Sequence, residues 1–232
     1  MVVRDSGPSI IDKLLGQYEN HDDAHFVGEY LRMYAQYPAL LKCWCKMGRI
    51  QTLLRVILNF NFNIQSDAVE TTIYLLMTER ANDIDWANFI EENKVRFIET
   101  FSQLYDEITD DDAGDKDDGE NKQNAHDDEG GNFFALKELM KLQYQMLTKQ
   151  DKCFKSMQHY WSNNKQCLIQ VMQLMEYEDD SLIYECILQL SLFLRPSRSP
   201  EIKKVLTQQS KPLIEAIEQY QPRHPPEDDF IQ

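Results

Sequence analysis

The spacing of the apolar residues is the feature that most limits what this chain can fold into. Apolar side chains recur three and four positions apart along most of the sequence, which places them on one face of an α-helix. No convincing run alternates strictly between apolar and polar residues, as a half-buried strand would. The sequence therefore predicts an all-α fold. Three of the apolar stripes are Phe26, Val27, Tyr30, Leu31 and Tyr34; Phe97, Ile98, Phe101, Leu104 and Tyr105; and Leu136, Leu139, Met140, Tyr144 and Leu147.

Proline and capping residues divide the predicted helices into short pieces. Pro38 interrupts the helical pattern after Tyr37, and the run from Ser199 to Glu201 supplies a capping hydroxyl, a first-turn proline and an acid. We expect about ten to twelve helices of roughly 9 to 18 residues, which fit a stack of helical hairpins better than a bundle of long helices. The predicted architecture is an armadillo- or HEAT-like right-handed solenoid, an α–α superhelix, with an irregular bundle as the alternative.

One acidic segment carries most of the net charge. Residues 106–131 hold twelve Asp or Glu against two Lys, a net charge of −10 out of −15 for the whole chain. Four glycines and almost no apolar residue after Ile108 leave this segment unable to offset the entropy of ordering, so we expect a disordered insertion. The expected organisation is helical repeats over 1–105, the insertion over 106–131, further helical repeats over 132–221 and a tail over 222–232.

Composition and motifs argue against several classes of function. A chain of net charge −15 is a poor partner for nucleic acids or anionic membranes, because both require basic surface. The sequence has no phosphate-binding glycine loop or His-Glu-x-x-His helix, and its five cysteines lack the spacing of a metal site. The acidic segment does not place carboxylates as a twelve-residue calcium loop requires. We expect a cytoplasmic protein with no enzyme activity, cofactor or metal, since no signal peptide or membrane-spanning stretch is found.

The segment from Phe62 to Ala68 reads Phe-Asn-Ile-Gln-Ser-Asp-Ala. It resembles a stretch of the calcium-binding protein 39 family, also called the mouse-protein-25 scaffolds. The similarity extends over nearly the whole chain, which corresponds to about the last two thirds of a full family member, so we expect the first helical repeats to be missing. Further similar segments are Leu31-Arg32 before Pro38, Phe89-Ile-Glu-Glu, Asn132-Phe133, Leu168 to Met175, Pro212-Leu-Ile-Glu and Glu227-Asp-Asp-Phe.

The resemblance implies a curved, armadillo-like stack of helices that binds protein kinases and catalyses no reaction itself. Family members bind the pseudokinase STRAD, and they activate Ste20-like kinases by holding the regulatory helix of the kinase lobe in its active position. The expected partners are therefore STRAD-like or Ste20-like kinases or pseudokinases, and the expected role is their activation in intracellular signalling. A non-activating adaptor or competitor is the alternative, because the first repeats are missing and two family lysines are Ile169 and Gln208 here.

The resemblance also implies a peptide site. Family members hold a Trp-Glu-Phe tail of STRAD in a pocket on successive C-terminal helices, and the matching positions here are Phe133, Lys137 and Met172, with Phe62 in the same groove. The apolar side chains would receive the peptide's Trp and Phe. Lys137 would meet the carboxylate as a point charge, without the fork geometry of an arginine. The alternative is that Phe133 and Met172 are ordinary core residues.

Overall fold

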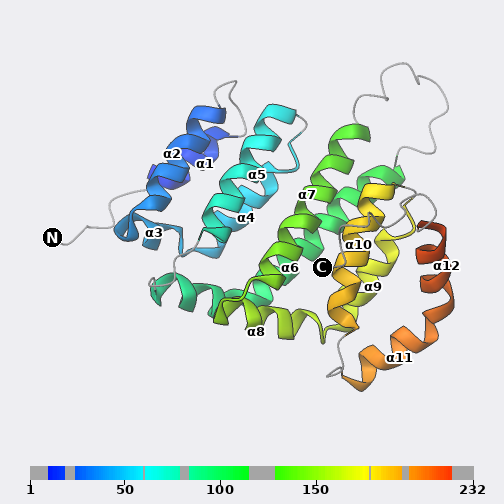
Figure 1. Ribbon diagram of the computed structural model, residues 1–232. Helices are drawn as coiled ribbons and strands as arrows, with labels where there is room; N and C mark the ends of the chain where they lie inside the picture. Colours follow the sequence, from blue (N-terminus) through cyan, green and yellow to red (C-terminus); the bar gives the residue numbers. More distant parts are fainter. Residues whose placement is uncertain are drawn as a thin grey trace, which may run out of the picture. The chain divides into compact units, whose positions relative to one another are not determined.

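The computed structural model describes residues 10–18, 24–59, 61–78, 84–114, 129–177, 179–194 and 199–220. Within these residues all regular structure is α-helical, as the apolar spacing predicts (Figure 1). The predicted tail, 222–232, lies outside the described residues. The helices are α1 (Ile10–Tyr18), α2 (Ala24–Gln36), α3 (Pro38–Trp44), α4 (Met47–Val56), α5 (Phe62–Met77), α6 (Ile84–Gly114), α7 (Glu129–Thr148), α8 (Lys152–Trp161), α9 (Lys165–Leu174), α10 (Asp180–Phe193), α11 (Pro200–Gln208) and α12 (Ser210–Tyr220).

The chain divides into two compact units, residues 1–157 and 158–232. In the first unit the helices form two layers (Figure 1). One layer consists of α2, α5 and α7, and the other consists of α1, α4 and α6, with α1 against α2, α4 against α5 and α6 against α7. This recurrence of packed helix pairs is the helical-repeat arrangement that the sequence predicts.

Two predicted helix starts are confirmed, and a third helix begins at an asparagine cap. The Ser199 hydroxyl accepts the Ile202 N–H at 3.3 Å, and Pro200 is the first residue of α11. Pro38 likewise begins α3. At the start of α5, the Asn61 side chain accepts the N–H groups of the second and third helical residues at 3.0 and 3.4 Å. This cap places Phe62, one of the predicted site residues, at the first position of α5.

The helix α6 is longer than the sequence predicts. It runs for 31 residues to Gly114, and α7 begins at Glu129, so both helices extend into the segment 106–131 that we expected to be disordered. Leu104, Tyr105 and Ile108 are buried and anchor the C-terminal part of α6. From an anchored turn, each further residue adds one backbone hydrogen bond at little extra cost. The centre of the acidic insertion, 115–128, lies outside the described residues, so its disorder stays a prediction.

The stripe predicted on α2 is wrong for two of its residues. Val27 and Leu31 are buried, but Phe26 and Tyr30 are 58% and 54% exposed. Small side chains let α2 approach α1 and α5 closely, and this close approach decides which side of the helix is buried. The larger rings therefore lie on the opposite side. The small residues on the buried side of α2 are Ala24, Gly28 and Ala35.

The other two predicted stripes form the core of the first unit. All five residues of the α6 stripe are no more than 4% exposed, and on α7 every member except the half-buried Tyr144 is buried. Each fully buried large apolar side chain stabilises the fold by about 1.5–3 kcal/mol. The second unit has its own core, in which the rings of Trp161 and Phe193 lie 4.3 Å apart between centroids.

Candidate functional site

A buried polar network joins α1, α2 and α5 at the segment that carries the family resemblance. Asp67 is 7% exposed and accepts hydrogen bonds from the Tyr18 hydroxyl and from both terminal nitrogens of Arg32, the latter at 3.2 Å. Arg32 also donates to the Thr71 hydroxyl at 2.7 Å. Burial and the hydrogen bond to Asp67 raise the pKa of Tyr18 well above its ordinary value, so the phenol stays protonated and donates. The network therefore fixes three helices to one another.

Gly28 on α2 leaves the space that this network occupies. A Cβ at this position would overlap the Asp67 carboxylate and would lie 2.6 Å from the Tyr18 hydroxyl oxygen. Such approaches are far inside van der Waals contact, so a larger residue would displace the carboxylate. The segment from Phe62 to Ala68 thus resembles the family at a position, Asp67, whose role here is structural.

Three of the predicted site residues lie in the first unit, on α5 and α7. Phe62 is 60% exposed, and its ring contacts that of Phe134, with the centroids 5.1 Å apart and the planes at 60°. Phe133 is the half-buried neighbour of Phe134, and Lys137 follows one turn later on α7. The structure thus brings Phe62 to the predicted segment of α7. Sequence reasoning missed Phe134, although an aromatic pair at the start of a helix was a visible signal.

Met172 lies in the second unit, at a pocket between α9, α11 and α12. The pocket has a volume of about 380 Å³, and Lys165 and Glu176 are the charged residues of its described lining. Ile169 and Gln208, the positions at which the resemblance implies lysine, both line it. The pocket wall is therefore close to neutral. Its main apolar residues are Ile169, Met172, Met175, Val205 and Leu213.

The outer side of α2 carries an apolar line that sequence reasoning assigned in part to the core. Phe26, Tyr30, Met33 and Tyr37 are 58%, 54%, 45% and 57% exposed. We call these four residues the α2 stripe. A spacing of four and three positions aligns Phe26, Tyr30 and Met33 along the helix, opposite its buried side, and Tyr37 directly follows the end of α2. Large apolar side chains gathered in solvent are typical of a surface that binds another protein.

The described residues contain no cluster of metal-ligating side chains, and two of their thiols are buried. No three His, Cys, Asp or Glu side chains gather there in a way that could hold a metal ion. None of the described helices combines the length and the apolar character needed to cross a bilayer. Burial raises the pKa of the Cys167 and Cys186 thiols to about 12, so both stay protonated at neutral pH and serve as packing residues.

Comparison with known proteins gives one family. Residues 2–108 match the model of the Mo25-like family. No curated protein matches the chain. The matched range contains the Asp67 network, the α2 stripe and Phe62. It ends before Phe133, Lys137 and Met172, so the peptide site at those positions stays a prediction. The Mo25-like family is a family of scaffold proteins, and residues 2–108 of this chain are similar to it.

Proposed function

We propose that this protein binds a protein kinase or pseudokinase and shifts it toward the active conformation. The observation that carries the proposal is the exposed α2 stripe, which lies inside the segment that matches the scaffold family. The spacing of four and three positions between Phe26, Tyr30 and Met33 complements the apolar seam of a second amphipathic helix. The regulatory helix of a STRAD-like or Ste20-like kinase lobe is the partner helix that we propose.

The α2 stripe is large enough to bias such an equilibrium. A partner activates a kinase only if it binds the active conformation more tightly, and moving a population from 1:99 to 99:1 takes about 5.5 kcal/mol. Full burial of a large apolar side chain contributes about 1.5–3 kcal/mol, so covering a side chain that is about half exposed contributes roughly 1 kcal/mol. The four residues together supply about 4 kcal/mol. Contacts made only with the active conformation would therefore raise its population by about a thousandfold relative to the inactive one.

The pocket around Met172 is our proposed second contact, for a peptide tail of the partner. A volume of about 380 Å³ accommodates one or two large apolar side chains. Lys165 and Glu176 balance each other, while Ile169 and Gln208 add no charge, so apolar contact would dominate over attraction for a carboxylate. Phe62, Phe133 and Lys137 remain the proposed peptide contacts of the first unit.

The test adds the purified chain to a Ste20-like kinase and measures substrate phosphorylation together with co-purification. We expect the wild-type chain to bind and to raise the activity. Tyr30→Asp should abolish both effects, because a charge would be forced against the partner's apolar seam. Gln36→Asp is the matched control, since it adds the same charge at an exposed position of α2 outside the stripe.

Two other outcomes decide against parts of this proposal. Binding without increased activity would select the non-activating adaptor. Failure of the wild-type chain either to bind or to activate any kinase of this class would contradict the kinase scaffold altogether. Equal binding by the wild-type chain and Tyr30→Asp would show that the partner docks elsewhere.

A further inference from the structure

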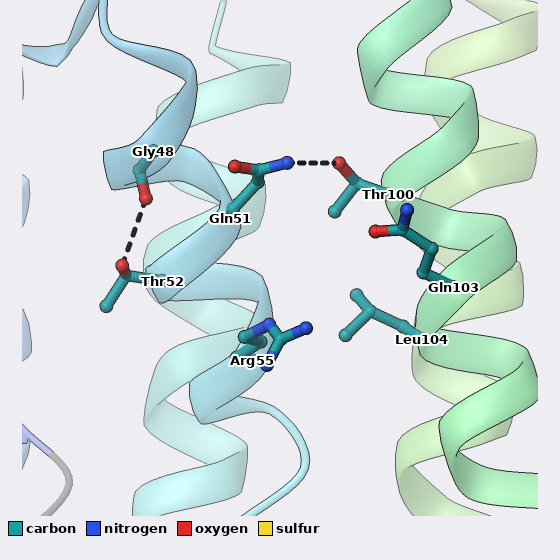
Figure 2. A pocket seen from close by; sticks show the side chains of 7 residues that line it. All are labelled: Gly48, Gln51, Thr52, Arg55, Thr100, Gln103 and Leu104. Atoms are coloured by element: carbon teal, nitrogen blue, oxygen red, sulfur yellow. Dashed lines mark hydrogen bonds between the residues drawn. The ribbon is translucent and has the colours of Figure 1, made fainter.

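The first unit also has a polar groove between α4 and α6, in the layer that does not contain α2. Two hollows of about 300 and 340 Å³ lie along these helices. Both are lined by Gly48, Gln51, Thr100 and Gln103, so they adjoin and form one groove. Figure 2 shows the α4 side chains facing those of α6 across it. The groove shares no residue with the α2 stripe or with the predicted peptide site.

Hydrogen bonds hold part of the groove's lining in place. Gln51 Nε2 donates to Thr100 Oγ1 at 3.1 Å (Figure 2). The Thr100 hydroxyl in turn donates to the Arg96 carbonyl at 2.7 Å. Because a carboxamide has two N–H donors and an oxygen acceptor, Gln51 retains one donor and its acceptor for another partner. Gln103 is exposed, and its carboxamide makes no hydrogen bond to another described residue. Two carboxamides on facing helices are therefore available to a ligand.

Gly48 keeps the α4 side of the groove open. A Cβ at this position would meet no atom within 4 Å, so packing within the described protein does not require a glycine here. Glycine in a helix is less stable than alanine by as much as about 1 kcal/mol. Since Gly48 lines both hollows, a larger side chain would project into the groove. Gly48 therefore leaves the groove open although it makes α4 less stable than alanine would.

Each end of the groove has an arginine, and the two differ in their ion pairing. At one end Arg55 is paired with Glu107, with 2.6 Å between nitrogen and oxygen. At the other end the lining contains Arg96 and Glu99, both exposed, and Arg96 forms no ion pair with a described residue. The α6 side of the lining extends eight residues, from Arg96 to Leu104, or about 12 Å at the helical rise of about 1.5 Å per residue. An extended peptide of about four residues has a similar length.

We infer that this groove binds a short segment of a partner protein in an extended conformation, with an acidic side chain of that segment at Arg96. Each carboxamide can pair with an N–H and a C=O of a peptide main chain, so Gln51 and Gln103 would hold the segment from both sides. The lining is too polar for an amphipathic helix or an apolar small molecule. The net charge of −15 disfavours nucleic acid.

The test uses phage-displayed random nine-residue peptides, panned on the full chain and depleted on its Gly48→Leu variant. The depletion step retains peptides that need the open groove. We expect the surviving peptides, made synthetically, to carry an Asp or Glu near one end and to lack helical apolar spacing. In fluorescence polarisation, the combined Gln51→Ala and Gln103→Ala variant should bind them about tenfold more weakly. It lacks the two side-chain carboxamides that would hydrogen-bond to the peptide main chain. Arg96→Ala should weaken binding and flatten its dependence on salt.

The matched control is Gly16→Leu on α1, where a Cβ also meets no atom within 4 Å. This variant should bind the peptides like the wild type. Thermal melting should show that the groove variants remain folded. Survival of no peptide after depletion, or equal affinity for the wild type and the double glutamine variant, would overturn the inference. Surviving peptides with helical apolar spacing would overturn it as well, because they would not bind in an extended form.

Discussion

Replacing Asp67 by alanine tests whether the buried network determines the stability of the first unit. The carboxylate, which is 6% exposed as a side chain, is the acceptor for Tyr18 and the charge partner of Arg32. The Arg32 side chain is itself only 11% exposed. After the substitution the guanidinium retains the Thr71 hydroxyl at 2.7 Å and a 3.9 Å approach to the exposed Glu70. Neither replaces a buried negative charge.

The expected loss of stability is about 3 kcal/mol. Removing one member of a buried ion pair costs about 3–5 kcal/mol, because the remaining charge is left without compensation. The remaining contacts of Arg32 place the loss at the low end of that range. With a urea dependence of about 2–3 kcal/mol per molar, the unfolding midpoint should fall by about 1–1.5 M. Asp67→Asn should lie between the wild type and Asp67→Ala, since it keeps an acceptor oxygen for Tyr18 but loses the charge.

The assay is urea unfolding at pH 7 followed by circular dichroism, with a double-mutant cycle between Asp67→Ala and Arg32→Ala. Glu215→Ala is the control, because it breaks the pair of Lys211 and Glu215, whose side chains are 86% and 57% exposed. It should change stability by less than about 0.5 kcal/mol. A loss below about 1 kcal/mol for Asp67→Ala, or a coupling energy near zero, would refute the reasoning.

Three further predictions follow from burial and pocket chemistry. Gly28→Ala should destabilise the chain by about 2 kcal/mol in urea unfolding despite alanine's better helix propensity, because its Cβ would overlap the Asp67 carboxylate, whereas Gly16→Ala should not. Stability should also decline as the pH rises from about 8.5 toward 12, because unfolded thiols ionise near 8.5 while those of Cys167 and Cys186 have a pKa of about 12. Alanine at both cysteines should make that decline shallower, and an unchanged slope would contradict the assignment. Ile169→Lys should strengthen the binding of a Trp-Glu-Phe peptide several-fold at low salt, measured by fluorescence polarisation, and an unchanged affinity would place the peptide outside this pocket.

The candidate site was predictable only in part. Resemblance selected Phe62 and the start of α7, yet the ring contact of Phe62 in the structure is with Phe134, the neighbour of the predicted Phe133. Resemblance also selected Met172, and the structure adds that Ile169 and Gln208 share its pocket. Helical spacing by itself would have chosen none of these residues, because a pocket is formed by side chains from several helices that are distant along the chain.

The sequence by itself determined the helices and most of their ends. A period near 3.6 is set by neighbours along the chain, and so are the caps at Ser199 and Asn61, where a side chain bonds N–H groups two or three residues away. The buried stripes of α6 and α7 follow from the same local pattern.

Only the tertiary structure decided which side of α2 is buried. Phe26 and Tyr30 satisfy the helical period as well as Val27 and Leu31 do, so the pattern alone cannot separate them. The choice depends on α5, whose Asp67 lies 35 residues beyond its partner Arg32 and needs the space beside Gly28. Close approach and charge pairing between distant segments placed the small residues inward. The same contacts left the large apolar residues outward, where they form the α2 stripe.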